Sequence, residues 1–325
     1  MLSLLGLSSL AALLSLSSGA YATSWGQALA YLFHDDGSHS AFAVIALRLP
    51  RLLCAFGVGI ALSLSGALIQ VIVRNPLGDP GLTGVTSGAA FGVALSLTLI
   101  SASPIGLLTA GVLGGSLAAF LTLTIAGGPR AAQPVHIILA GIAVSVFFLA
   151  ATSGVLVMSR SSMQTLYIWL VGGFINRGWT EFTLLWPVLL VGVSAALLLS
   201  PVLGLLRFDD DTATALGLRP ALWRAVAGAV SVLLAAVSVA VAGPLGFVGF
   251  VAPHLARMLI SRRLAHEHMA LWLGVSGLLG GTLVIWADTA SRLILAGRAP
   301  AGVLIAMIGG LAFLVLARKE LSLGK

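Results

Sequence analysis

The chain has 325 residues, of which 59% are hydrophobic and only 8% are charged, and its mean hydropathy is +1.10. A soluble protein carries about a quarter charged residues, so this composition excludes a soluble globular domain and predicts a polytopic membrane protein with a single domain over residues 1–325. The formal charge of +7 fits the usual excess of Lys and Arg in cytoplasmic loops, and it gives no reason to expect a nucleic-acid partner.

Ten apolar segments, separated by Gly, Pro or charged clusters, follow one another along the chain. They predict an all-α fold with about ten transmembrane helices, at residues 2–20, 49–72, 81–100, 105–126, 135–158, 182–206, 221–241, 246–260, 269–286 and 303–316. The eighth segment is short and broken by glycine, so the count depends on it. The first segment has no basic stretch before it, so we interpret it as a spanning helix; a cleaved signal peptide is the alternative.

The distribution of positive charge gives the chain an orientation. With the amino terminus in the cytoplasm, eleven of the 17 Lys and Arg residues fall on the cytoplasmic side, which is the bias expected of a membrane protein. Six arginines fall outside: Arg48, Arg51, Arg160, Arg177, Arg292 and Arg298. Two of these form the stretch RLPR before the second segment. Positive charge on this side indicates either recognition of an acidic surface or anchoring to lipid headgroups.

Two stretches of equal length resemble each other. RLLCAFGVGIALSLSGALIQVIVRNPLG and RPALWRAVAGAVSVLLAAVSVAVAGPLG both begin with Arg and end in Pro-Leu-Gly, at an offset of 168 residues. Because five predicted helices separate them, the two copies run in opposite directions across the membrane. This pattern favours an inverted internal repeat, which is typical of transporters, over a chance likeness between alanine-rich helices.

The sequence gives no sign of its own catalytic chemistry. It contains no G-x-x-x-x-G-K-[ST] phosphate loop, so we expect ATP and Mg²⁺ to be used by a separate ATPase and this chain to bind no cofactor or metal. An ion-coupled secondary transporter is the alternative, yet it needs ionisable groups in the membrane, and only Asp288 approaches that depth. An intramembrane hydrolase would pair Ser87 with His254, but such residues more often serve helix packing.

The most polar interior stretch is RFDDDTATALGLRPALWR, residues 207–224. Asp209 to Asp211 supply an N-cap and a negative first turn, Thr212 to Leu216 are expected to form a short helix, and Gly217 ends it. A short capped helix in a cytoplasmic loop offers a contact to a soluble partner. A solvated connector that is stabilised by its own caps is the alternative.

Several stretches carry a family resemblance in their order along the chain: RLPR, SGALIQ followed by RNPLGDPGLTGV, LAGIAVS, WLVGGFINRGW, DTATALGL, GPLGFVGFVAPHLAR, ADTASRL and PAGVLIAMIGGLAFLVL. Together they resemble the permeases of ATP-driven importers for iron-siderophores, haem and vitamin B12. The resemblance implies a multi-pass subunit of the bacterial inner membrane, paired as a homodimer or with a homologous permease. It also implies ATP-binding-cassette ATPase subunits below, a periplasmic substrate-binding protein above, and a metal chelate as cargo, with ferric siderophore first and haem and cobalamin after it.

The resemblance also assigns roles to individual residues. It implies docking of the binding protein on Arg48, Arg51 and Arg292, and a cytoplasmic gate at Asn75 and Leu77, although an Asn-Pro pair also simply ends a helix. ATPase coupling is implied for the short helix and its end: Asp211, Thr212, Ala213, Ala215, Leu216, Gly217 and Leu218. One departure is Arg298 in GRAPAG, where the family usually has Glu-Leu-Pro, so ion pairing near the outer mouth should differ.

Three aromatic residues are candidates for the lining of a wide apolar cargo cavity. They are Tyr167, Trp169 and Phe174, which all lie in the stretch YIWLVGGF, residues 167–174. Aromatic residues at this depth are more often anchors at the membrane interface, which is the alternative.

Overall fold

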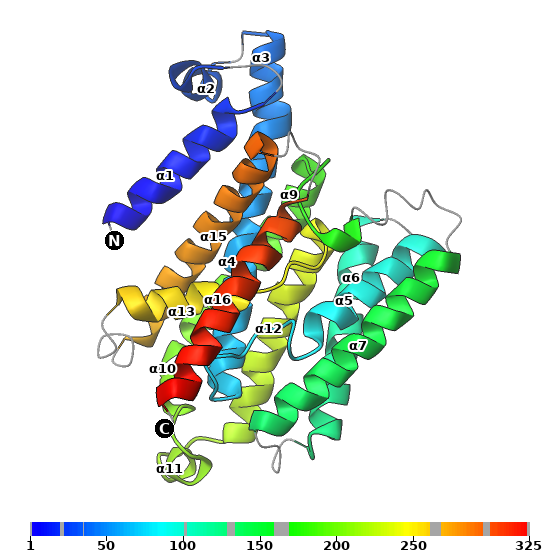
Figure 1. The fold of residues 1–325 in the computed structure, drawn as a ribbon, viewed down its shortest axis with the longest axis vertical. Coiled ribbons are helices and arrows are strands. Elements are labelled where there is room, and N and C mark those ends of the chain that lie inside the picture. The colour runs from blue at the N-terminus through cyan, green and yellow to red at the C-terminus, as the bar shows by residue number, and fades with distance from the viewer. Residues whose placement is uncertain are drawn as a thin grey trace.

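The computed structural model describes residues 2–19, 23–34, 36–100, 103–128, 134–158, 169–260, 268–294 and 300–323, and every regular element within these ranges is helical. The all-α class predicted from composition is therefore confirmed. Figure 1 shows the helices, which are α1 (Leu2–Ser17), α2 (Trp25–Tyr31), α3 (His39–Phe42), α4 (Leu49–Ile72), α5 (Val85–Leu95), α6 (Pro104–Ile125), α7 (Pro134–Met158), α9 (Trp179–Leu198), α10 (Ser200–Leu205), α11 (Asp210–Ala215), α12 (Pro220–Ala242), α13 (Val248–Leu259), α15 (Met269–Ile294) and α16 (Ala301–Leu323).

Six helical runs are long and apolar enough to cross a membrane: His39–Ile72, Pro104–Ile125, Val135–Met158, Trp179–Leu198, Pro220–Ala242 and Met269–Ile294. Four shorter apolar helices cover Leu4–Ser17, Val85–Leu99, Val248–Leu259 and Ala301–Ala312. Each of the ten segments expected from the sequence overlaps one of these helices. The polytopic character of the chain therefore agrees with its composition.

Proline is present at two of the boundaries that differ from the expected segments. The second segment was expected to begin at Leu49, but the helix starts at His39 and continues through a π-helical turn, Ala43–Arg48, into α4. Pro50 lies in the first turn of α4, where its missing N–H does not stop the run. The sixth segment is divided at Leu199, because Pro201 opens α10 and cannot donate to the preceding turn.

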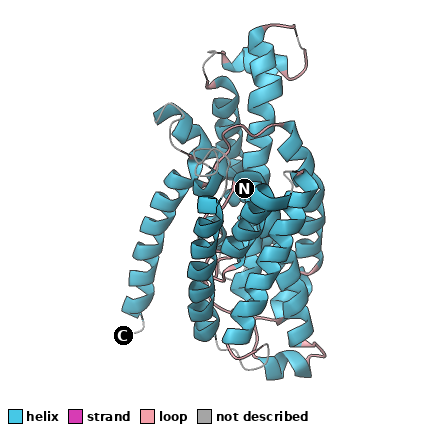
Figure 2. Ribbon diagram, turned by 90° about the vertical axis from the view of Figure 1, so that its right-hand side faces the viewer, coloured by secondary structure: helices cyan, strands magenta, loops and turns pink. Residues whose placement is uncertain are grey.

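Most of the long helices run obliquely along the long axis of the molecule, whereas the short α13 lies across it (Figures 1 and 2). One end carries α2 and α3, and the other carries α11. α4 runs through the middle and packs against α9, α12, α13 and α15. Most of its side chains are buried, so it forms the centre of the core.

Glycine allows α4 to approach its neighbours closely. A Cβ atom on Gly66 would lie 2.0 Å from the carbonyl oxygen of Gly249 in α13, and one on Gly59 would lie 2.3 Å from that of Gly280 in α15. Membrane helices lack a hydrophobic driving force toward one another, so close backbone contact between small residues is a main source of their association. These glycines therefore fix how near α13 and α15 lie to the central helix.

The centre of the fold also contains a reciprocal polar contact between α4 and α12. The Ser65 and Ser231 hydroxyls lie 2.8 Å apart, and each also donates to the other's backbone carbonyl, Ser65 at 2.9 Å and Ser231 at 3.1 Å. Both residues are fully buried. Figure 1 shows that the two helices run in opposite directions where they cross. The buried hydroxyls thus find hydrogen-bond partners in each other's residues.

The turns that follow α4 and α12 lead into two short buried helices. Both turns contain Pro-Leu-Gly, and both following helices begin after a left-handed residue, Gly84 (φ 83°) before α5 and Phe247 (φ 66°) before α13. Asp79 joins these regions, since its carboxylate accepts the Gly81 N–H at 2.7 Å and also faces the Phe250 N–H. The side chain of Asp79 is 5% exposed, so this cap is internal to the fold.

Candidate functional site

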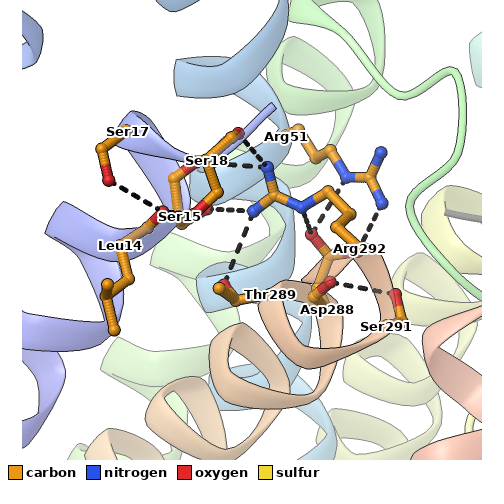
Figure 3. A network of polar contacts seen from close by, with 9 residues as sticks. All are labelled: Leu14, Ser15, Ser17, Ser18, Arg51, Asp288, Thr289, Ser291 and Arg292. Atoms are coloured by element: carbon orange, nitrogen blue, oxygen red, sulfur yellow. Dashed lines mark hydrogen bonds and ion pairs between the residues drawn. The ribbon is translucent and has the colours of Figure 1, made fainter. Parts of the chain in front are cut away.

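The end of the molecule that carries α2 and α3 contains a buried carboxylate between two arginines (Figure 3). Asp288 of α15 is 1% exposed. Arg51, at the start of α4, donates Nε to Oδ2 at 3.0 Å and Nη2 to Oδ1 at 2.7 Å, which is a two-point contact. Arg292, one turn after Asp288, has its Nε 3.4 Å from Oδ2. Such a paired arrangement compensates the burial of the carboxylate.

Two arginines at this end also hold the last turn of α1. Arg48 donates Nη1 to the Leu16 carbonyl at 2.7 Å and to the Thr23 hydroxyl at 2.9 Å. Arg292 donates Nη2 to the Ser15 hydroxyl at 2.6 Å. The last carbonyls of a helix lack internal partners and carry partial negative charge, so cations stabilise them. The two side chains therefore cap α1 from outside its own sequence.

The three arginines implied in docking are thus brought together, but their surroundings differ from those expected. Arg48 is 7% exposed and donates its hydrogen bonds into the fold, so little of its side chain lies on the surface. The side chains of Arg51 and Arg292 are 19% and 13% exposed. Arg48, Arg51, Arg292 and Asp288 together carry a formal charge of +2, and we call them the outer charge cluster.

At the opposite end, the proposed gate residues lie in the turn after α4. Asn75 accepts the Leu77 N–H on its side-chain oxygen at 2.9 Å, and its own N–H donates to the Gln70 carbonyl at 3.1 Å. Both side chains are half-buried. Arg74 has a φ of 51°, so the chain reverses before the proline. The helix therefore does end at this Asn-Pro pair, and the side chain of Asn75 shapes the turn.

The short helix predicted in the polar loop is present as α11. Asp209 caps it by accepting the Thr212 N–H at 3.1 Å, and the pKa of Asp209 is held below its usual value by hydrogen bonds from Thr212. At the other end Gly217 has a φ of 86°, and the Leu218 N–H donates to the Ala213 carbonyl at 3.0 Å. Both caps predicted from the sequence are confirmed, and the helix begins two residues earlier and ends one residue earlier than expected.

The two faces of α11 differ. Ala213 is fully buried against the rest of the chain, whereas Leu216 is 56% exposed and Ala215 is also exposed. Asp211, Thr212 and Gly217 lie on the exposed side as well. Of the residues implied in coupling, Ala213 therefore holds α11 on its own chain, Leu218 is half-buried, and the others are exposed.

Asp210, the first residue of α11, joins three elements. Its carboxylate accepts Nη2 of Arg74, after α4, at 2.6 Å and Nη1 of Arg224, in α12, at 2.9 Å. The hydrogen bond from Arg224 is the largest reason why the pKa of Asp210 lies below its ordinary value, so the group stays ionised at neutral pH. Sequence reasoning assigned Asp210 only to the N-terminal cap.

A cation–π stack supports the loop that leads into α11. The guanidinium carbons of Arg207 and Arg257 each lie 5.1 Å from the centroid of the buried Trp272 ring. Arg257 also donates to the side-chain oxygen of Gln70, whose amide nitrogen donates to the Gly249 carbonyl at 3.2 Å. This chain of contacts links the loop to α13, α15 and α4. No motif in the sequence pointed to it, because its members come from four separate segments.

The aromatic residues considered for a cargo cavity do not line an open space here. Phe174 is fully buried in a core cluster that contains Leu185, and Trp169 is 8% exposed among small side chains of α5 and α12. Tyr167 lies outside the described residues, as do Arg160 and Arg298. The two described aromatics therefore contribute to the packed core of this single chain.

The residues weighed for a hydrolase have structural partners. Ser87 donates its hydroxyl to the Gly84 carbonyl at 2.9 Å at the start of α5. The His254 ring lies 6.0 Å from the Phe250 ring, centroid to centroid, in α13. Both side chains thus contribute to local packing of the short helices.

Comparison with known proteins identifies the family. The profile of the FecCD transport family matches residues 7–319. The Fe(3+)-citrate import system permease protein YfmD of Bacillus subtilis is 36% identical over 307 residues, covering 94% of this chain and 90% of that protein. The Fe(3+) dicitrate transport system permease protein FecC of Escherichia coli is 38% identical over 279 residues, covering 84% of this chain and 82% of that protein.

A solved structure described as an inward-facing conformation of a metal-chelate type ABC transporter superposes with a TM-score of 0.81 at 32% identity, and the match covers 98% of both chains. Because these matches cover nearly the whole chain, the similarity extends over the entire fold and is not confined to short motifs. The chain belongs to the FecCD transport family and is a permease subunit of an ATP-binding-cassette importer.

Proposed function

We propose that this chain carries a ferric chelate from the periplasm to the cytoplasm through the bacterial inner membrane. The observation that supports it best is that the two ends of the fold carry different features. One end has the outer charge cluster, and the other has the exposed helix α11, which is capped at both of its ends. Relatives are named as permeases for ferric citrate and ferric enterobactin, and one is named for cobalamin. Ferric siderophore or a related ferric chelate is therefore our first cargo, before haem and cobalamin.

We further propose ten spans with an inverted internal repeat. Three observations support the repeat. α4 and α12 cross in opposite directions through the reciprocal Ser65 and Ser231 contact, their following turns share Pro-Leu-Gly, and a left-handed residue precedes both α5 and α13. A two-fold relation between the halves brings nearly equivalent residues together at the axis, and Ser65 and Ser231 are 166 positions apart, within two positions of the 168-residue offset of the repeat. With this topology α11 lies on the cytoplasmic side.

The proposed contact to the ATPase is the exposed face of α11. Its partner is an ATP-binding-cassette subunit that hydrolyses ATP with Mg²⁺, while this permease makes and breaks no covalent bond. Asp210 ties α11 to α4 and α12 through Arg74 and Arg224, so a displacement of α11 reaches the membrane helices directly. The permease is proposed to work as a homodimer or with a homologous permease.

The outer charge cluster is proposed to receive the periplasmic binding protein. Its formal charge of +2 attracts an acidic surface, and Arg51 and Arg292 retain partial exposure. Arg48 contributes to the local charge and holds the end of α1 in place. Asp288, the ionisable residue that an ion-coupled transporter would have used, is occupied by two arginines, which favours the ATP-driven function.

The experiment that tests this function is uptake by proteoliposomes that contain the permease, the ATPase subunits and the binding protein. We expect ATP-dependent uptake of a radiolabelled ferric chelate and no uptake when the ATPase subunits are omitted. Cobalamin and haem serve as competing cargoes. Uptake driven by a proton or sodium gradient without the ATPase would contradict the proposal.

A charged residue at Ala215 is expected to uncouple the permease. Ala215→Arg adds volume and charge to the exposed face of α11, and overpacking of a fitted contact costs about 1–3 kcal/mol, equivalent to about 5- to 150-fold in affinity. Co-purification with the ATPase subunits and ATP-driven uptake should both fall by about that factor. Ala30→Arg, exposed on α2 at the other end, is the matched control and should keep the ATPase subunits bound. Retention of the ATPase by the Ala215 variant would remove α11 from this contact.

A further inference from the structure

An apolar groove with one charged end opens beside α12, near the cytoplasmic side that the proposed topology assigns. Its volume is ≈ 1090 Å³, at the upper end of small-molecule sites. The walls come from the ends of α4 and α6 and the starts of α5, α7 and α12. Figure 1 shows the lower ends of α6 and α12 next to the start of α7. The groove lies outside the contacts that the proposed function uses, except at Arg74, Asp210 and Arg224.

Small residues on one face of α12 create the hollow. Ala221, Ala225, Gly228 and Ala229 recur at helical spacing along the groove, and Val232 closes the row. At a rise of 1.5 Å per residue this face is about 16 Å long. One leaflet of a bilayer has a hydrocarbon depth of about 15 Å, half of the ~30 Å core. The groove therefore has the length of an acyl chain in a single leaflet.

The charged end lies where a headgroup would be. Among the described residues that line the groove, the charged ones are Arg74, Asp210 and Arg224, which together carry a formal charge of +1. Both guanidinium groups share the single carboxylate of Asp210, and the Nε donor of Arg224 has no hydrogen-bond partner in the described part of the chain. Asp210 is half exposed, so this end is open to water.

An apolar length with a cationic end matches an anionic amphiphile. Apart from the hydroxyls of Thr83, Ser116 and Thr122, the remaining side chains of the lining are apolar, and they offer few polar groups to a hydrophilic ferric chelate. Basic pockets between membrane helices on the cytoplasmic side are suited to anionic lipid headgroups. We propose that this groove binds an anionic phospholipid of the cytoplasmic leaflet, with its acyl chain along α12 and its phosphate at Arg74 and Arg224.

The position of this site connects it with coupling. The phosphate would accept hydrogen bonds from the same two arginines that hold Asp210, the first residue of α11. The lipid therefore competes with Asp210 for these cations or joins it in a shared network. In either case the composition of the cytoplasmic leaflet influences how firmly α11 is held.

Native mass spectrometry of the full-length permease with its ATPase subunits tests the proposal. The probes are dioleoyl-phosphatidylglycerol and dioleoyl-phosphatidylcholine, which share their acyl chains and differ in charge. We expect the wild type to retain phosphatidylglycerol preferentially, and Arg74→Gln or Arg224→Gln to lower its occupancy about fivefold each. Each single variant keeps one ion pair to Asp210. Arg219→Gln, exposed just before α12 and absent from the groove wall, is the matched control and should bind as the wild type does.

A second variant tests the apolar part and leaves the ion pairs intact. Ala229 is exposed in the groove, so Ala229→Phe fills it without entering the core, and both lipids should be lost. Ser194→Phe, exposed on α9, adds similar bulk elsewhere and should change neither. Equal retention of the two lipids by the wild type, or unchanged phosphatidylglycerol in Arg224→Gln and Ala229→Phe, would overturn the proposal. Displacement of lipid by the ferric chelate or by a second permease copy would also overturn it. None of these readings depends on transport, so the proposed function is tested separately.

Discussion

Alanine at position 66 is expected to prevent stable packing of the permease, although the substitution adds a single methyl group. The added Cβ would lie 2.0 Å from the Gly249 carbonyl oxygen and 2.4 Å from the Gly249 Cα. Both are backbone atoms, so no side chain can rotate away, and α4 and α13 must separate. Overpacking of this kind costs about 1–3 kcal/mol and sometimes more, and separation also removes contacts around Asp79. Thermal unfolding in detergent and the yield of monodisperse protein measure the effect.

The same substitution elsewhere provides the control. Gly274 lies inside α15 and is exposed, and a Cβ there would meet nothing within 4 Å. Gly274→Ala is therefore expected to stabilise the protein by about 0.5–1 kcal/mol, because glycine in a helix interior loses more backbone entropy than alanine. The two variants should shift the melting temperature in opposite directions. Equal melting temperatures for Gly66→Ala and the wild type would show that the helices do not approach as described.

The second large effect is expected from Asp288→Asn. The substitution keeps the shape of the side chain but removes the charge that compensates Arg51 and Arg292, and it leaves one less acceptor for the fork of Arg51. Removing one partner of a buried ion pair costs about 3–5 kcal/mol, because the remaining charge stays desolvated. The free energy of unfolding should fall accordingly, and α1 should become accessible to proteases, since Arg292 also holds Ser15.

Two further variants test whether the loss of the ion pair causes the expected instability of Asp288→Asn. Arg51→Gln combined with Asp288→Asn removes charge from both sides, so the double variant should regain part of the loss. Arg177→Gln breaks a pair with Glu181 whose atoms are 3.7 Å apart and whose side chains are 20% and 26% exposed, and we expect a change of about 1 kcal/mol or less. A double variant as unstable as the sum of its single variants would argue against a paired charge at Asp288.

Local patterns were readable from the sequence because their partners are near in the chain. The caps of α11 depend on Asp209 and Gly217, eight positions apart, and both act as predicted. The apolar segments and the family also followed from composition and short motifs. The second segment was expected to begin at Leu49, inside the stretch RLPR, whereas the helix continues without a break from His39 and proline in the first turn of α4 is compatible with it.

The site contacts depended on long-range approaches that a single sequence does not display. Arg48 was expected at the rim, but its acceptor at Leu16 lies 32 positions away, and only the folded chain shows that α1 ends beside it. Arg51 and Asp288 are 237 positions apart. Phe174 was judged by its residue type, although its depth depends on neighbours such as Leu185. The sequence therefore indicated which residues carry charge, and the fold decides which charges meet.

The crossing of α4 and α12 has a mechanical consequence. Asp210 connects α11 to Arg74 at the end of α4 and to Arg224 near the start of α12, so both helix ends follow a displacement of α11 together. The same helices are joined at mid-length by Ser65 and Ser231, whose paired hydroxyls resist sliding along the helix axes. We therefore expect the two helices to tilt about this serine pair more readily than they slide past each other, so that a displacement of α11 at one end changes the angle at which α4 and α12 cross.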